Sequence, residues 1–154
     1  MRLRVIAAGT RMPAWVKDGT QDYARRLPPE YRFEIVEIAL SDPKRGAARA
    51  LREEGARMLA AVDARDRVVS LAIDGRRFGT QELAERLAAW QQDRRDLAFL
   101  IGGPEGLAPE CLERSELRWS LSPLTLPHAL VRVVLAEQLY RAWSILAGHP
   151  YHRG

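Results

Sequence analysis

Short apolar runs alternate with longer amphipathic stretches along the chain. The runs are rich in branched aliphatic residues and are bounded by glycine, proline or charged residues, which is typical of strands. They predict five strands, over residues 2–8, 33–39, 67–74, 97–101 and 117–122. The amphipathic stretches predict four long helices, over residues 13–27, 47–62, from residue 80 onward and over 128–147. Strands that alternate with helices favour an α/β domain with a mostly parallel sheet and helices on both faces.

Local signals refine this outline. Residues 75–79 predict a turn after the third strand, and Thr80 is expected to cap the helix that follows. The strand over residues 33–39 has apolar side chains on both faces, so we expect helices to cover both. A short helical segment over 109–116 contains Cys111, which we interpret as a small buried apolar residue rather than a nucleophile.

The last predicted helix, residues 128–147, is apolar over most of its surface. One apolar stripe comprises Leu130, Val134, Leu135, Leu139, Ala142 and Leu146. A helix of this kind must be buried on nearly all sides. A homodimer interface is the simplest cover for its second face, and burial within a monomer core is the alternative. Glu137 and Arg141 are four residues apart and are expected to form a pair on the helix surface.

Composition narrows the class of protein. The 154 residues, 47% of them hydrophobic, suit a single domain over residues 1–154 with a sizeable core. No apolar run approaches the roughly 20 residues that cross a bilayer, and the run near the N-terminus is too short for a signal peptide. Cys111 is the only cysteine, so no intrachain disulfide can form, which suits a reducing cytoplasm.

The basic residues are almost all arginine. The net charge is +4, and the 24 basic residues are 22 arginines and 2 lysines. Guanidinium groups match phosphates and stack on bases, so the bias is compatible with an RNA partner. A genomic base composition that favours arginine codons explains the same bias. The charge alone is therefore weak support for a nucleic-acid partner.

Two loops follow the fourth and fifth predicted strands and are candidates for a ligand site. Gly102–Gly106 reads GGPEG, and its glycines permit close approach of a ligand to the backbone. Ser122–Pro127 reads SPLTLP, and its prolines make it stiff and keep its backbone out of the sheet. Neither loop has the spacing of a dinucleotide fingerprint or a phosphate-binding P-loop. A tight turn and a rigid connector are the plain alternatives, but a single ligand that bridges both loops accounts for the pair.

The final six residues, HPYHRG, form a tail dense in histidine, tyrosine and arginine. Tyr151, His152 and Arg153 suit stacking on an unstacked base, hydrogen bonding to it or contact with phosphate. A frayed polar tail is the alternative. His149 and His152 have a spacing seen in metal ligands, but no cysteine or carboxylate cluster accompanies them, so no metal site is expected.

Four motifs together are specific. They are VIAAGTRMPAWV from Val5, LIGGPEGL from Leu100, SLSPLTLPHALVRVVLAEQLYRAWSI from Ser120 and HPYHR from His149. With them the chain resembles, from end to end, the ribosomal RNA large subunit methyltransferase H family of the SPOUT class. The resemblance implies an α/β trefoil knot in the C-terminal half and a cytoplasmic homodimer that uses S-adenosylmethionine. It also implies methylation of N3 of a pseudouridine in large-subunit (23S) rRNA within the assembled ribosome.

The resemblance also assigns roles to residues. The cofactor positions fall on Leu71, Gly102, Gly103, Leu121, Ser122, Pro123, Leu124, Thr125 and Leu126. The catalytic candidates come instead from a mechanistic hypothesis based on residue type, and they are His152, Arg132, Arg141, Tyr151 and Arg153. His152 is the candidate general base by residue type. The arginines would hold phosphates or stabilise the developing imide anion. The tail of one subunit is expected to reach the cofactor site of the other.

Two rival functions stay open at this point. The first keeps the SPOUT fold but acts on tRNA or on another rRNA nucleotide. The second is a non-catalytic factor that binds the ribosome through its basic surface.

Overall fold

All five strands lie in one parallel sheet. The computed structural model describes residues 1–153, so only Gly154 lies outside the described residues. The sheet has the order β2-β1-β4-β3-β5, and each neighbouring pair is parallel. The strands are β1 (Leu3–Ala8), β2 (Glu34–Ile38), β3 (Arg67–Arg77), β4 (Leu97–Ile101) and β5 (Leu117–Ser120). The predicted parallel sheet is therefore confirmed.

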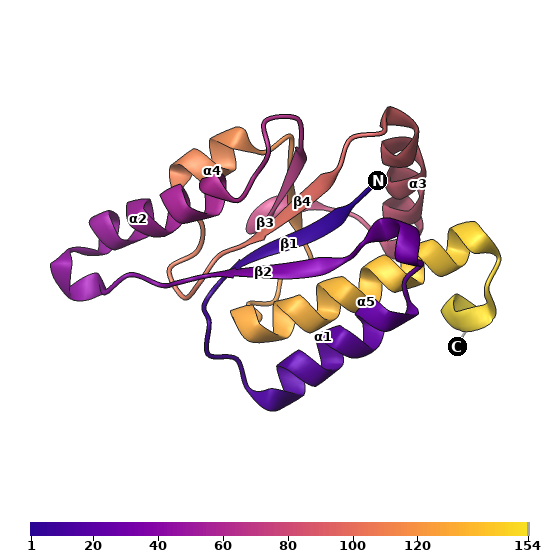
Figure 1. Ribbon diagram of the computed structural model, residues 1–154, viewed down its shortest axis with the longest axis horizontal. Helices are drawn as coiled ribbons and strands as arrows, with labels where there is room; N and C mark the ends of the chain where they lie inside the picture. Colours follow the sequence, from indigo (N-terminus) through magenta and orange to yellow (C-terminus); the bar gives the residue numbers. More distant parts are fainter. Residues whose placement is uncertain (154) are drawn as a thin grey trace.

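Helices cover both faces of this sheet, as predicted (Figure 1). They are α1 (Ala14–Arg26), α2 (Ala47–Ala60), α3 (Thr80–Asp93), α4 (Pro109–Arg114) and α5 (His128–Ala147), with short 3-10 helices η1 (Pro29–Tyr31), η2 (Pro43–Arg45) and η3 (Pro150–Arg153). α5 packs between α1 and α3 on one face, and α2 packs with α4 on the other. The trefoil knot expected from the resemblance stays a prediction.

The buried strands supply both cores by alternation of their side chains. In β1, Leu3 and Val5 enter the core beneath α3 and α5, whereas Ile6 enters the core beneath α2 and α4. In β4, Phe99 and Leu100 divide in the same way. Successive side chains of a strand point to opposite faces, so a strand covered on both sides must be apolar throughout. All six residues of β1 and all five of β4 are buried.

Two expectations about local structure are wrong. β2 pairs only with β1 and forms one edge of the sheet, and its residues are mostly half-buried or exposed. Apolar side chains on both faces therefore did not mean a strand sandwiched between helices. Thr80 does not cap α3, because Gly79 occupies that position and the Thr80 hydroxyl donates to Gln138 Oε1 on α5 at 2.7 Å. The threonine links two helices instead.

The predicted turn over residues 75–79 is partly strand. β3 continues to Arg77 through an irregularity in which Leu71 and Arg76 both pair with Trp119 of β5. Residues 72–75 therefore leave the ladder between these two pairings, as in a β-bulge. Gly75 permits this path, because a Cβ there would lie 2.7 Å from the backbone of Arg118. The displaced residues form a wall of the pocket described below.

α5 has exactly the predicted bounds, but its burial is uneven. Within the predicted stripe, Leu135, Leu139 and Ala142 are fully buried, whereas Leu130 and Val134 are only half-buried. The chain therefore covers one face of α5 and leaves part of the other accessible. No helix among residues 1–153 is long and apolar enough to span a membrane.

Candidate functional site

A pocket of about 360 Å³ lies at the carboxyl ends of β3, β4 and β5. Parallel α/β sheets bind ligands at this edge. The bulge of β3 forms one wall, the loop after β4 a second, and the loop after β5 with the start of α5 a third. The sequence prediction that one ligand could bridge the two loops is geometrically sound, because both loops line the same pocket.

Most of the predicted cofactor residues meet in this pocket. Those that line it are Leu71, Gly102, Gly103, Leu121, Ser122, Leu124 and Leu126. Pro123 and Thr125 belong to the same loop but are not among the lining residues. The lining also includes residues that sequence reasoning missed: Ile73, Asp74, Glu105, Trp119, His128 and Val131. The apolar run that ends at Asp74 gave no signal for Ile73 or Asp74, because the bulge places them there.

The loop over residues 121–126 offers its backbone to a ligand. Among residues 1–153, no backbone–backbone hydrogen bond involves this loop. Two bonds join its backbone to side chains: Leu124 N donates to Ser122 Oγ at 2.9 Å, and the Ser122 carbonyl accepts from Ser120 Oγ at 3.0 Å. Trp119 adds an indole Nε1 that is buried without a hydrogen-bond partner in the described chain. Buried polar groups normally have partners. These free groups therefore suit a flat ligand with several donors and acceptors.

The charge of the lining restricts the ligand further. Asp74 and Glu105 supply carboxylates, and no lysine or arginine is among the lining residues in the part of the chain that the structure describes. A phosphate group requires donors of positive charge or a cradle of backbone amides. The pocket therefore favours a neutral or cationic ligand over a nucleotide phosphate.

The tail lies at the opposite end of α5 from the pocket. His128 and Val131, which line the pocket, belong to the first turn of α5, and η3 follows its last turn (Figure 1). A helix of 20 residues is about 30 Å long. Tyr151 and His152 are therefore not brought to the pocket of their own subunit.

The tail packs against the end of α5 and is not frayed. The Tyr151 hydroxyl donates to Glu137 Oε2 at 2.9 Å, and the Tyr151 ring packs edge-on against Tyr140 at 4.6 Å between centroids. Glu137 also binds Arg141 Nη2 at 2.9 Å, which confirms the predicted pair. Burial, with hydrogen bonds to Tyr23 and Glu137, raises the pKa of Tyr151. The structure thus brings two of the catalytic candidates, Tyr151 and Arg141, together on one carboxylate.

His152 contacts a buried serine. Its Nδ1 lies 3.2 Å from the hydroxyl oxygen of Ser144, which is fully buried, and that hydroxyl donates its proton to the Arg141 carbonyl at 2.7 Å. With the serine proton directed to that carbonyl, the hydroxyl oxygen can accept a hydrogen bond from Nδ1. The neutral imidazole then carries its lone pair on Nε2. Arg153 is exposed beside it.

Arg132 does not occupy the position expected of a catalytic group. It is 3% exposed, and its guanidinium binds Glu37 Oε2 at 2.6 Å and the carbonyls of Ala8 and Gly9 at 3.2 and 2.8 Å. These partners tie α5 to the ends of β1 and β2. The arginine looked free in the sequence because its partners lie about 95 and 124 positions away. Among residues 1–153, no three His, Cys, Asp or Glu side chains form a group that could hold a metal ion.

Comparison with protein families gives a match over almost the whole chain. The model described as "Predicted SPOUT methyltransferase" matches residues 1–152. Three relatives carry the name "Ribosomal RNA large subunit methyltransferase H". They come from Pseudomonas paraeruginosa (55% identical), Azotobacter vinelandii (54%) and Chromohalobacter salexigens (56%). Each alignment covers 99% of this chain and 100% of the relative.

Solved structures agree on the fold. A probable methylase family protein from Haemophilus influenzae Rd KW20 has a TM-score of 0.58 at 14% identity, over 97% of this chain and 69% of that one. A putative methylase family protein from Neisseria gonorrhoeae has a TM-score of 0.54 at 15% identity, over 90% and 81%. With the full-length relatives above, these likenesses place the chain in the SPOUT class of methyltransferases, within the ribosomal RNA large subunit methyltransferase H family.

Proposed function

We propose that this methyltransferase uses S-adenosylmethionine to methylate N3 of a pseudouridine in large-subunit (23S) rRNA of the assembled ribosome. The observation that carries the proposal is the pocket, in which the two predicted loops meet around two carboxylates without a lysine or arginine. The names of the full-length relatives support the RNA substrate. A cytoplasmic location fits such a substrate.

The pocket suits the proposed donor in both charge and shape. The sulfonium of S-adenosylmethionine is cationic, which matches the carboxylates of Asp74 and Glu105. Its adenine ring is flat and can form hydrogen bonds with the backbone groups of residues 121–126 that have no backbone partner. The half-exposed loop residue Leu126 and the bulge residue Leu71 give apolar walls for a ring. When bound, S-adenosylmethionine supplies an electrophilic methyl group.

The proposed working form is a homodimer through α5 and α1. Leu130 and Val134 are half-buried on α5, and Trp15 is 56% exposed at the start of the neighbouring α1. α1 runs along α5, since a Cβ on Gly19 would lie 3.3 Å from Val133. A two-fold axis across α5 pairs its first half with the second half of the partner helix. That arrangement moves each tail toward the partner subunit's pocket.

In the composite site, His152 is the proposed base. N3 of the base carries a proton that must leave as the methyl group arrives, and the free Nε2 of His152 can accept it. Tyr151 and Arg153 would then hold the nucleotide by stacking and hydrogen bonding. Arg141 lies beside Tyr151, with its guanidinium carbon 5.0 Å from the ring centroid, and would stabilise negative charge on the imide. Arg132 instead supports the fold, as its partners indicate.

Mixed dimers test the composite site directly. One variant carries Gly102→Ala to damage the pocket, and the other is truncated after Pro150 to remove the tail. Each homodimer should transfer almost no methyl to intact ribosomes. The mixed dimer contains one intact pocket with one intact tail, and we expect it to recover up to half of the wild-type activity. A mixed dimer as inactive as both parents would show that the tail does not serve the partner subunit's pocket.

Titration with S-adenosylmethionine separates this enzyme from the non-catalytic alternative. Calorimetry should give binding in the micromolar range, and rRNA from cells with and without the gene should differ by one methyl group at one pseudouridine. Absence of binding favours the ribosome-binding factor. A methyl group lost from tRNA or from another rRNA nucleotide favours the other SPOUT activity.

A further inference from the structure

One short segment of the chain is strongly positive. Residues 43–52 carry four basic side chains and no carboxylate, and the remaining 144 residues hold 20 basic and 20 acidic side chains. These four side chains therefore equal the whole net charge of +4. The structure shows where the charge is and what lies next to it.

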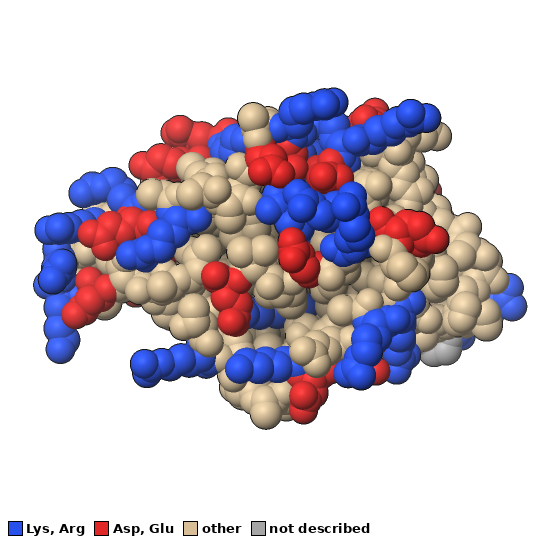
Figure 2. Space-filling model, in the orientation of Figure 1, with Lys and Arg blue, Asp and Glu red and all other residues tan. Residues whose placement is uncertain are grey.

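This segment, named here the basic tip, comprises η2 and the first turns of α2. Its basic residues are Lys44, Arg45, Arg49 and Arg52. The basic tip lies at one end of the long axis of the molecule, where lysine and arginine side chains gather and project into solvent (Figures 1 and 2). All four residues are exposed.

Most of these charges have no acidic partner. Arg49 pairs with Glu53 one turn later at 3.1 Å. Within the described residues, no carboxylate lies within 4.0 Å of a charged nitrogen of Lys44, Arg45 or Arg52. Ion pairing within the fold thus gives no reason for these three cations.

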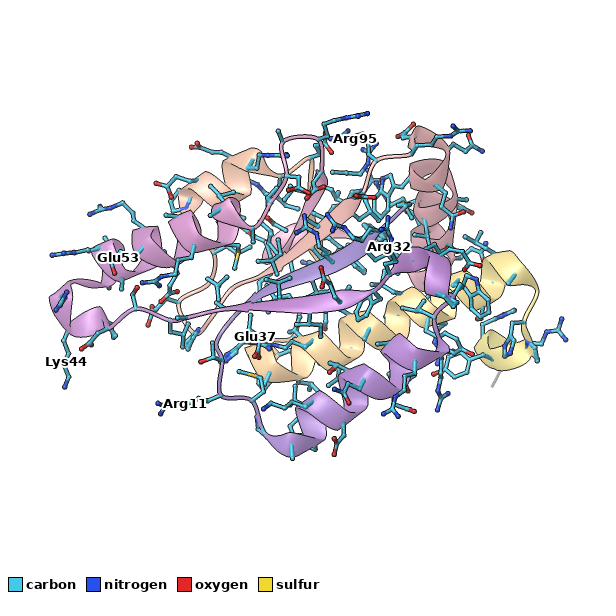
Figure 3. All side chains as sticks on the ribbon, in the orientation of Figure 1. Arg11, Arg32, Glu37, Lys44, Glu53 and Arg95 are labelled. Carbon is cyan, nitrogen blue, oxygen red and sulfur yellow. The ribbon has the colours of Figure 1, made fainter. Side chains whose placement is uncertain are left out.

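Residues on both sides of the basic tip in the sequence contact a loop of the pocket. The loop that leads into the basic tip packs on the loop after β4, since a Cβ on Gly103 would lie 2.8 Å from Leu40 Cδ2 and 3.9 Å from Glu54 Oε1 of α2. Gly103 lines the pocket. Figure 3 shows Arg11, from the loop after β1, and Lys44 projecting at this same end of the molecule. The basic tip is therefore connected, through Leu40 and Glu54, to the loop after β4 that lines the pocket.

We propose that the basic tip docks the phosphate backbone of the rRNA that flanks the target nucleotide. This rests on the proposed function for the identity of the RNA. The pocket itself has no lysine or arginine in its lining, so backbone phosphates need cations elsewhere on this face. Flexible exposed cations bind phosphates without reading bases, and such contacts fix the position of a nucleic acid on a protein. The basic tip holds the RNA while the tail and the pocket act on one base.

A pair of matched double variants tests this role. Lys44→Gln with Arg45→Gln removes two charges from the basic tip. The control variant, Arg65→Gln with Arg94→Gln, removes two exposed charges near the amino-terminal ends of β3 and β4. Both residues line a separate hollow there. The measurements are KM for ribosomes over a salt series, binding of ribosomal particles by sedimentation, and the Kd for S-adenosylmethionine by calorimetry.

For the basic-tip variant we expect KM for ribosomes to rise about tenfold, with kcat and the Kd for S-adenosylmethionine unchanged. The plot of log KM against log salt should become shallower by about 1 to 2, since each phosphate contact contributes about 0.7 to 0.9 to its slope. Addition of Arg52→Gln should extend both changes. The control variant should behave like wild type.

Three outcomes would count against the proposal or its basis. Equal KM and salt slopes in both double variants would overturn the docking role and leave the enzyme assignment intact. Weaker binding to whole particles, with undiminished binding to protein-free large-subunit rRNA, would point to a ribosomal protein and would also overturn it. A wild-type enzyme that transfers no methyl to rRNA would overturn the proposed function instead, and sedimentation would still report on the basic tip.

Discussion

The Ser144 hydroxyl lies 3.2 Å from Nδ1 of His152 and donates its own proton to the Arg141 carbonyl. This relationship favours one tautomer of the neutral histidine. A hydroxyl that is already a donor can only accept from the imidazole, so Nδ1 carries the hydrogen and Nε2 is free. In the proposed mechanism, the serine would orient His152 to accept a proton without touching the substrate.

Replacement of Ser144 by Ala should lower kcat about fivefold to tenfold, because about 1 kcal/mol of hydrogen bonding that orients the ring is lost. KM for ribosomes and the Kd for S-adenosylmethionine should not change. Ser115→Ala is the matched control, since that hydroxyl also donates to a carbonyl of its own helix, at 2.8 Å, but lies far from the tail. An equal loss of kcat in both variants would refute the orienting role.

Replacement of Gly102 by Ala should damage the pocket specifically. The new Cβ would lie 2.4 Å from the carbonyl carbon of Gly106, which is backbone and cannot move aside easily. The loop would have to shift, and we expect the Kd for S-adenosylmethionine to rise at least tenfold in calorimetry. Gly79→Ala is the control, because a Cβ there has no neighbour within 4 Å. Normal binding by the Gly102 variant would argue against the loop as a cofactor clamp.

Replacement of Arg132 by Gln should lower the stability of the fold and not only the rate of methyl transfer. The change removes an ion pair at 2.6 Å with Glu37 and two hydrogen bonds to buried carbonyls, and it should cost about 2 to 3 kcal/mol of unfolding free energy. Urea denaturation measures this loss. An unchanged denaturation midpoint together with lost methyl transfer would restore Arg132 to the catalytic group.

The thiol of Cys111 should be inert in the native protein. Burial raises its pKa to about 11, so only about 0.1% is thiolate at pH 8. Iodoacetamide should label it slowly in buffer and rapidly in urea. Because the folded pKa lies above the unfolded one, this group favours folding below about pH 9, and that contribution is lost as the pH rises toward 11. Fast labelling of the native protein at pH 8 would contradict the burial.

Periodicity predicted the buried parts of the fold well. β4, and β1 apart from Arg4, are apolar because helices cover both of their faces. α5 has its predicted ends because Pro127 precedes it and Gly148 follows it. The same logic failed for β2. Its apolar side chains are partly exposed at the sheet edge, and edge position depends on strand order, which local sequence does not contain.

The parts of the site with an unusual backbone composition could be predicted from the sequence. The parts that depend on contacts between residues far apart in the sequence could not. Glycines and prolines identified both loops of the pocket. The wall that contains Ile73 and Asp74 was missed because a bulge opposite Trp119 creates it. Arg132 was assigned to catalysis by residue type, but only the fold could show that Glu37 and two carbonyls already use its guanidinium.

The length of α5 also limits how the protein can vary. The helix separates pocket from tail by about 30 Å, and each added residue would rotate the tail by about 100° and advance it by about 1.5 Å. A single insertion within the helix would therefore change the position of the tail relative to the pocket. In a two-fold dimer the change occurs twice, once at each site. In the proposed dimer, the number of residues in α5 is therefore constrained more tightly than their identity.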